Sequence, residues 1–271
     1  MCAIVFYQLI KTMNRGICNR TVIPLRAAAD HRSEIVNQLF FAEYFEVLAE
    51  NEEWAQVRML DHTAYVGWLQ KEQFVRIPES VPEPLFQGAY QLVDLQNSTL
   101  LPGTKIYKQI PHVITELLSF PKEGSINLRR PNTSDFHSEV QALCAYYKGA
   151  PYLWGGRTRY GIDCSGLTQA MYAHFGLLLP RDAYQQATYG ELIEDLSQVQ
   201  QGDLAFFGEE GGRITHVGFI LHPNLIFHAS GYVRQDPFDK QGIYNEKQEK
   251  YTHKLRFVKR LLTFKATDPC Q

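Results

Sequence analysis

Short β-type runs of apolar and branched residues dominate the first quarter of the chain and predict strands. Turn-like or charged segments separate these runs, which cover residues 17–25, 43–48, 54–59 and 65–69. Several short strands at close spacing are typical of a small barrel. We therefore predict a β-barrel domain over residues 1–77, with an irregular lead-in over residues 1–17.

A proline-rich segment follows, in which residues 78–84 read P-E-S-V-P-E-P. Proline fixes the backbone and cannot donate to a ladder, so this composition predicts a stiff, extended linker. Further short β-like runs at residues 88–95, 104–107 and 125–128 predict a second small β unit. Together the linker and this unit make a predicted segment over residues 78–131, which ends at the turn-like P-N-T-S.

From residue 132 the pattern changes to helices followed by strands. One apolar stripe at helical spacing predicts a helix over residues 135–147, and it includes Phe136, Val140, Leu143, Cys144 and Tyr147. A second helical pattern starts after Asp163 and ends before Gly176. Strand patterns then follow at residues 203–207, 216–221, 225–230 and 255–262. This order predicts an α+β domain over residues 132–271, with helices packed on one side of an antiparallel sheet.

A cysteine stands at the predicted start of the second helix. Asp163 is a natural N-cap, because its carboxylate accepts hydrogen bonds from backbone N–H groups of the first turn. Cys164 follows in that turn, where unpaired N–H groups and the helix dipole favour a thiolate. Since a cysteine nucleophile reacts as the thiolate, Cys164 is a candidate nucleophile. A cysteine merely packed at a helix start would give the same local pattern.

Two histidines on neighbouring predicted strands supply a candidate base. If the strands pair around a three-residue loop at 222–224, Gly218 faces His228 and His216 faces Ser230. The two histidines then project from one face, diagonally adjacent, whereas a loop one residue longer or shorter would separate them. A lone histidine on a strand is usually a packed residue, but the pair predicts a base and a group that orients it.

Composition narrows the classes of function. A net charge of -2 and a pI near 6.5 give no electrostatic case for nucleic acid or an anionic membrane. The five cysteines are irregularly spaced and lack C-x-x-C, which argues against a disulfide framework and a structural zinc site. A zinc site of Cys164, the two histidines and Asp163 stays a minor alternative, because it lacks a close ligand pair.

The N-terminus carries an apolar run whose first basic residue, Lys11, comes after it rather than before. A secretory signal needs the opposite order, and no apolar stretch approaches the length of a membrane-spanning helix. We therefore expect a cytoplasmic protein, with a periplasmic or cell-envelope location as the alternative.

Longer motifs surround the candidate residues, namely Y-L-W-G-G, D-C-S-G, L-P-R-D-A-Y-Q-Q, Q-G-D-L-A-F-F, T-H-V-G and F-H-A-S. In this order, over roughly residues 137–262, they resemble the NlpC family of papain-like cysteine peptidases, which cut bacterial peptidoglycan peptides. The earlier segments F-E-V-L, W-A-Q-V-R and Y-V-G-W-L resemble a bacterial SH3-like domain. The resemblance implies a papain-like domain preceded by one or two SH3-like barrels.

The resemblance also implies roles for single residues. Cys164 would attack, His216 would carry the proton and His228 would orient His216. Tyr152 would add a donor beside the nucleophile, although a packed aromatic residue explains it equally well. In members similar to dipeptidyl-peptidase VI, the aspartate before the cysteine recognises the free amine of an N-terminal L-Ala.

For the substrate end of the cleft, the resemblance implies binding by Asp163, Ser165, Arg181 and Asp182. Arg181 would hold the free carboxylate of D-Glu, with a surface ion pair as the alternative. Tyr65 of the SH3-like domain matches a residue of the cleft wall, which would make that domain a gate. The alternative is a wall-binding module that leaves the cleft open.

We therefore predict a cysteine endopeptidase that hydrolyses the γ-D-glutamyl–diamino acid bond of stem peptides with a free L-Ala, in cell-wall recycling. It is expected to act as a monomer and without a cofactor. A less selective hydrolase of polymeric peptidoglycan, or a non-catalytic wall-binding protein, remains as an alternative.

Overall fold

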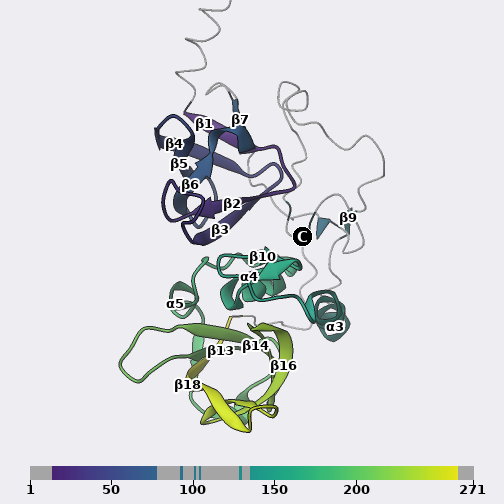
Figure 1. Ribbon diagram of the computed structural model, residues 1–271. Helices are drawn as coiled ribbons and strands as arrows, with labels where there is room; N and C mark the ends of the chain where they lie inside the picture. The colour runs from purple at the N-terminus through teal and green to yellow at the C-terminus, as the bar shows by residue number, and fades with distance from the viewer. Residues whose placement is uncertain are drawn as a thin grey trace, which may run out of the picture. The chain divides into compact units, whose positions relative to one another are not determined.

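The computed structural model describes residues 14–77, 92–93, 101, 104, 128–129 and 135–261. The chain divides into two compact units, Met1–Arg130 with Trp154–Gly156, and Pro131–Leu153 with Arg157–Gln271. In Figure 1 the first unit runs from purple to blue and the second from teal to yellow.

The first unit is built from short antiparallel strands around one apolar core. They are β1 (Arg15–Cys18), β2 (Val22–Arg26), β3 (Ile35–Phe40), β4 (Tyr44–Glu50), β5 (Trp54–Met59), β6 (Val66–Gln70) and β7 (Phe74–Ile77), with the short helix η1 (Lys71–Gln73). They form a seven-stranded sheet in the order β3-β2-β6-β5-β4-β1-β7. Buried side chains such as Leu25, Phe45 and Val57 fill its core.

The strand pattern of the first unit differs in detail from the sequence prediction. The run at 17–25 is two strands, β1 and β2, which form no ladder with each other because β1 pairs with β4 and β7. β3 and β7 are additional. The second predicted β unit lies outside the described residues, except that β8 (Leu92–Val93) pairs with β9 (Leu128–Arg129).

The helices of the second unit begin where side chains cap them. They are α3 (Phe136–Tyr147), α4 (Cys164–His174), α5 (Ala183–Gln186) and the short helix η3 (Leu196–Gln198). Asp135 caps α3 by accepting from the Ser138 N–H at 3.2 Å. Four of the five residues of the predicted stripe are buried, with Cys144 3% exposed, and Phe136 is half-buried. The predicted helix over 135–147 and the core position of Cys144 are therefore confirmed.

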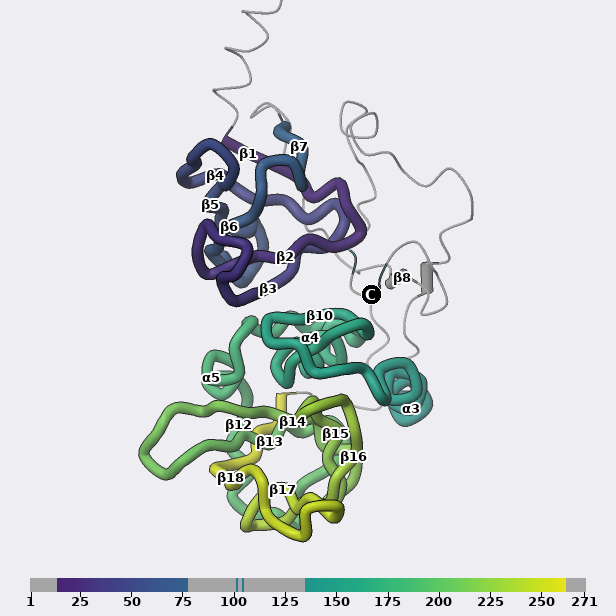
Figure 2. Tube along the Cα trace, viewed as in Figure 1, coloured from purple at the N-terminus to yellow at the C-terminus, as the bar shows by residue number. Residues whose placement is uncertain are grey.

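The main sheet of the second unit closes into a ring, and the strands of this unit are short apart from the last. They are β10 (Arg157–Thr158), β11 (Gly161–Ile162), β12 (Glu191–Ile193), β13 (Leu204–Phe207), β14 (His216–His222), β15 (Leu225–Ser230), β16 (Tyr232–Asp239), β17 (Gly242–Asn245) and β18 (Lys250–Arg260). β10 and β11 form a separate two-stranded sheet, and the other strands form one sheet in the order β12-β18-β13-β14-β15-β16-β17, in which β17 pairs again with β18. Figure 2 shows the resulting ring, which closes because the long β18 serves as a partner of β12, β13 and β17.

Helix α4 contacts β14 and β15, the strands that carry the two candidate histidines. Tyr172 of α4 packs edge-on against Phe219 of β14, with ring centroids 5.9 Å apart. On its other side, His174 pairs with the buried Glu139 of α3 at 2.8 Å. These contacts fix the start of α4 relative to the histidine strands. Within the described ranges, every helix is too short or too polar to cross a bilayer.

Candidate active site

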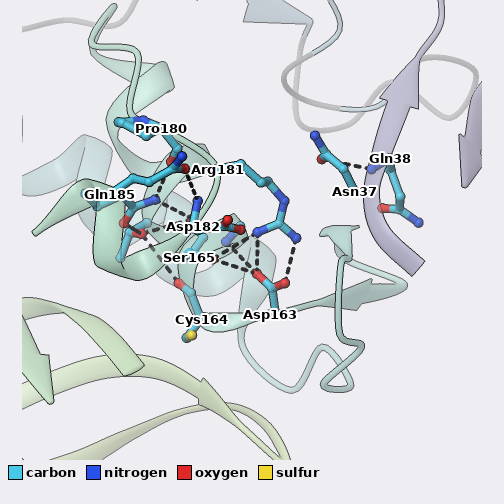
Figure 3. Close-up of polar contacts among 12 residues, drawn as sticks. Asn37, Gln38, Asp163, Cys164, Ser165, Pro180, Arg181, Asp182 and Gln185 are labelled. Carbon is cyan, nitrogen blue, oxygen red and sulfur yellow. Dashed lines mark hydrogen bonds and ion pairs between the residues drawn. The ribbon is translucent and has the colours of Figure 1, made fainter. Parts of the chain in front are cut away.

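Cys164 is the first residue of α4, as its sequence context predicted. The Asp163 carboxylate accepts a hydrogen bond from the Gly166 N–H at 2.7 Å and so caps the helix. The Cys164 side chain is 5% exposed, and Figure 3 shows its sulfur pointing away from the Asp163 carboxylate. The backbone N–H of Val217, the residue after His216, hydrogen-bonds to this sulfur. The nucleophile therefore lies at the start of the first histidine strand.

The charge state of Cys164 differs from the sequence expectation. Burial, helped by the negative charge of Asp163, raises the pKa of the thiol to about 12. The Val217 and Ser165 N–H groups and the Arg181 charge lower this pKa, but burial outweighs them. A helix start alone therefore does not make a thiolate in the resting site, and that expectation was wrong. The sulfur needs a base that accepts its proton.

The two candidate histidines lie together, buried, on β14 and β15. His216 is 5% exposed and His228 is fully buried. The Nε2 atom of His216 lies 2.9 Å from the Nδ1 atom of His228, which is a hydrogen bond between the rings. Their predicted position on one face is confirmed.

The β14–β15 hairpin that brings the two histidines together keeps the predicted register on the side of Ile220 where the histidines lie. Phe219 pairs with Phe227 and Ile220 with Ile226, which places Gly218 opposite His228 as expected. Nearer the turn the prediction was wrong, because β14 extends to His222 and a bulge leaves only residues 223–224 in the loop. The irregularity lies beyond Ile220, so it leaves the parity of the two histidines unchanged.

Three further residues complete this cluster, and the sequence reasoning did not identify them. Asp236 of β16 accepts from His228 Nε2 at 3.1 Å and from Arg234 Nε at 2.8 Å. His253 of β18 stacks on His216 with ring centroids 4.1 Å apart and planes 31° apart. β16 was not among the predicted strands, and His253 lies just before the predicted start of the last one. A strand prediction over 232–239 would have placed Asp236 beside His228.

His216 is held neutral in the resting site. Burial, together with electrostatic repulsion between its protonated form and the His253 and His228 rings, lowers its pKa well below the usual value. A neutral imidazole beside a neutral thiol is a resting pair in which the ring can accept the proton. The ring nitrogen left for this task is Nδ1, because Nε2 is engaged by His228. His216 is thus suited to act as a base when a substrate arrives.

An ion pair buried beside the nucleophile joins three of the predicted substrate-binding residues. Arg181 donates to Asp163 Oδ1 at 3.0 Å and Oδ2 at 2.6 Å, and to the Ser165 hydroxyl at 2.9 Å (Figure 3). Arg181 is 1% exposed and Asp163 is 4% exposed. This pairing gives Arg181 an internal partner, and because both side chains are buried it is not the surface ion pair considered as the alternative. Binding of the D-Glu carboxylate by Arg181 stays a prediction.

The remaining predicted residues fall in different places. Asp182 precedes α5 and forms a capping box with Gln185. Tyr152 is half-buried, and burial together with the charges of Cys164 and Asp163 raises the pKa of its hydroxyl, which stays a donor beside the nucleophile. Tyr65 belongs to the first unit, where it packs against that core. Its role at the cleft stays a prediction.

Across the described part of the chain, no group of His, Cys, Asp and Glu side chains is arranged to hold a metal ion.

Comparisons with known proteins place both units. Residues 149–256 match the model of the NlpC/P60 family, and residues 25–74 match that of the bacterial dipeptidyl-peptidase SH3 domain. A γ-D-glutamyl-L-lysine dipeptidyl-peptidase of Bacillus subtilis (strain 168) is 29% identical over 217 residues, 72% of each chain. A bifunctional muramidase/DL-endopeptidase of the same strain is 35% identical over 148 residues, 53% of this chain and 44% of that one.

A solved structure extends the likeness to the fold. The crystal structure of an NlpC/P60 family protein from Bacillus cereus ATCC 10987 has a TM-score of 0.64 and 16% identity, and it covers 92% of this chain and 100% of that chain. The cysteine at the start of α4 and the paired histidines all lie within the residues that match the NlpC/P60 family model. The chain carries an NlpC/P60 cysteine peptidase domain, preceded by a bacterial dipeptidyl-peptidase SH3 domain.

Proposed function

We propose that this protein hydrolyses the γ-D-glutamyl–diamino acid bond of peptidoglycan stem peptides that begin with a free L-Ala, during cell-wall recycling. The observation that carries the proposal is the buried pair His216–His228 beside Cys164, which makes a complete nucleophile, base and orienter. The relative named γ-D-glutamyl-L-lysine dipeptidyl-peptidase supports the bond assigned. The proposed arrangement is papain-like, with helices packed against the antiparallel sheet.

The proposed reaction begins with a proton transfer. His216 takes the thiol proton of Cys164, and the sulfur attacks the γ-carbonyl carbon of D-Glu. The backbone N–H of Cys164 and the Tyr152 hydroxyl stabilise the oxyanion of the tetrahedral intermediate. His216 then gives its proton to the leaving amine of the diamino acid, which departs and leaves a thioester. Water, deprotonated by His216, hydrolyses the thioester and releases L-Ala-D-Glu with the free thiol.

Recognition of the free amine falls to Asp163 in this proposal. Its carboxylate is held in one orientation by Arg181, by Ser165 and by the Gly166 N–H. A carboxylate fixed in advance loses little entropy when it binds an ammonium group, which favours selectivity for an unblocked terminus. Arg181 then acts through Asp163, and Asp182 keeps α5 in place beside them.

A digest followed by mass spectrometry tests this function. The full chain is reduced and given L-Ala-γ-D-Glu-diaminopimelate and the same peptide with its amine acetylated, with Cys164→Ala as the control. We expect L-Ala-D-Glu only from the free-amine peptide and only with the unaltered enzyme. Cleavage of both peptides would remove the proposed selectivity and the gating role predicted for Tyr65.

A less selective wall hydrolase is the second candidate, favoured by the likeness to the muramidase/DL-endopeptidase across the peptidase domain. It predicts release of peptides from purified polymeric peptidoglycan as well as from the tripeptide. A wall-binding protein without turnover predicts that cosedimentation with peptidoglycan survives Cys164→Ala and that neither form cuts any peptide.

A further inference from the structure

A line of hydrogen bonds runs from His216, past His228, to Asp236 and Arg234. His216 Nε2 lies 2.9 Å from His228 Nδ1, and His228 Nε2 lies 3.1 Å from Asp236 Oδ2. Arg234 Nε donates to the same Asp236 oxygen at 2.8 Å. His228 is fully buried and Asp236 is 8% exposed, so water competes little for these positions. The line joins β14, β15 and β16.

Hydrogen-bonding chemistry fixes the direction of every bond in this line. Burial acts to raise the pKa of Asp236, but the hydrogen bonds and charges of His228 and Arg234 outweigh it and lower this pKa, so Asp236 is an ionised carboxylate that only accepts. His228 Nε2 must then carry a proton. Burial lowers the pKa of His228, so the ring is neutral and its Nδ1 holds a lone pair. That lone pair requires a proton on His216 Nε2, which leaves His216 Nδ1 unprotonated.

We infer that Asp236 is a positioning residue of the peptidase: through His228 it selects the tautomer in which His216 presents a bare Nδ1 to Cys164. This inference rests on the proposed function only in assigning His216 as the base. In the opposite tautomer Nδ1 carries a proton, and a neutral His216 cannot accept one from the thiol. The tautomer of His216 therefore decides whether this ring can accept the proton of the Cys164 thiol.

Arg234 supplies an internal means of testing the inference. Guanidinium groups only donate hydrogen bonds. Any side-chain atom that takes the place of Asp236 Oδ2 must therefore accept the hydrogen bond of Arg234. In Asp236→Asn, the amide oxygen is forced to face Arg234 and His228, because the amide nitrogen would meet two donors. This variant loses the charge but keeps the tautomer, whereas Asp236→Ala loses both.

The experiment uses two readouts that need no peptide substrate. Histidine ¹⁵N chemical shifts of the full, reduced chain report directly which ring nitrogen carries the proton, with His216→Gln and His228→Gln for assignment. The rate at which iodoacetamide alkylates Cys164 reports how readily His216 takes the thiol proton. This rate is measured by mass spectrometry on the proteolytic peptide that contains Cys164. Asp203→Asn is a matched control, because Asp203 is a 1% exposed carboxylate of the same unit paired with Arg260 at 2.8 Å.

We expect Nε2-protonated His216 and His228 in the unaltered chain and in Asp236→Asn, and a mixture of tautomers in Asp236→Ala. Alkylation of Cys164 at pH 7.5 should fall roughly tenfold in Asp236→Ala and by less than about threefold in Asp236→Asn, because only the first loses the orienting acceptor. Asp203→Asn should keep the normal rate and tautomers.

Two results would overturn the inference. One is an unchanged His216 tautomer in a folded Asp236→Ala protein, and the other is equal loss of alkylation in both Asp236 variants, which would assign the effect to charge. If Asp236→Ala does not fold, a His216 Nδ1 that carries the proton in the unaltered chain still contradicts it. Failure of the peptide digest leaves both readouts unaffected, so the two proposals fail separately.

Discussion

At the scale of single residues, the ion pair between Arg181 and Asp163 lies in the interior next to the nucleophile. Both oxygens of Asp163 accept from the guanidinium, and both side chains are almost fully buried. Two charges withdrawn from water depend on each other, because either one left alone keeps its desolvation cost without the compensating attraction. The pair also connects the first turn of α4 with the segment before α5.

We predict that Arg181→Met destabilises the peptidase domain by about 3–5 kcal/mol, since it leaves the Asp163 carboxylate buried without its cation. Arg181→Lys should recover part of this loss, because an ammonium group restores the charge but not the two parallel hydrogen bonds. Urea unfolding of the full chain measures both variants. An Arg181→Met protein within about 0.5 kcal/mol of the unaltered one would show that the pair does not stabilise this domain.

At the scale of elements, the β14–β15 hairpin depends on a glycine opposite His228. A Cβ atom on Gly218 would lie 2.5 Å from Ile226 Cδ1 and 3.1 Å from His228 Cβ. Gly218→Ala is therefore expected to cost about 1–3 kcal/mol by overpacking. Ile226→Ala alone should cost about 2–5 kcal/mol because it leaves a cavity.

The two changes should compensate when combined, since the new methyl group occupies space that Ile226 vacates. We expect the double variant to be more stable than the sum of the single effects by at least about 1 kcal/mol. Pulse proteolysis of the four proteins in the cycle supplies the numbers. If the two single effects add without compensation, the strands must move apart at Gly218 to accept the new methyl group, so that it does not clash with Ile226.

The same hairpin shows which features of the site could be predicted from the sequence. Side-chain parity along a strand has a period of two, so the spacing of His216, Gly218 and His228 was enough to predict that the histidines meet. The bulge near His222 escaped prediction, because a local pattern does not reveal an extra residue in a ladder. The cap at Asp163 was predicted because capping is local to α4.

Partners that depend on closure of the sheet were missed for a physical reason. β16 carries Arg234, Asp236 and Pro237, and charged residues and proline both argue against a buried strand. Its charged residues are tolerated because they satisfy one another and His228. His253 reaches His216 only because β18 closes the ring. The raised pKa of Cys164 likewise reflects burial by the whole domain, which the helix start alone does not indicate.

At the scale of the whole molecule, the site makes the peptidase domain sensitive to acid. His216, His228 and His253 share one cluster, and burial lowers the pKa of each below the ordinary value of 6.5. For His253 the pKa falls to about 4. An unfolded chain binds protons at these groups from about pH 6.5 downward, while the folded chain does not.

Stability should therefore fall as the pH drops below about 6.5, because the unfolded state then holds more protons than the folded one. Each histidine contributes at most about 1.4 kcal/mol per pH unit, and for His253 the window ends near pH 4. Asp236, whose pKa is lowered, adds a loss only at more acidic pH, as the carboxylate itself becomes protonated.

His253→Phe separates this effect from stacking, since phenylalanine keeps an aromatic face against His216 but binds no proton. We expect this variant to lose less stability than the unaltered chain between pH 6.5 and pH 4.5, while the two lose equally little between pH 8 and pH 7. Native-state hydrogen exchange of the β14 amides follows this domain by itself, which matters because a chain of two units need not unfold in one step. Equal slopes for both proteins at acidic pH would mean that His253 takes up its proton in the folded domain as readily as in the unfolded chain. The acid sensitivity would then belong to His216 and His228, the two rings whose neutral state the proposed base chemistry requires.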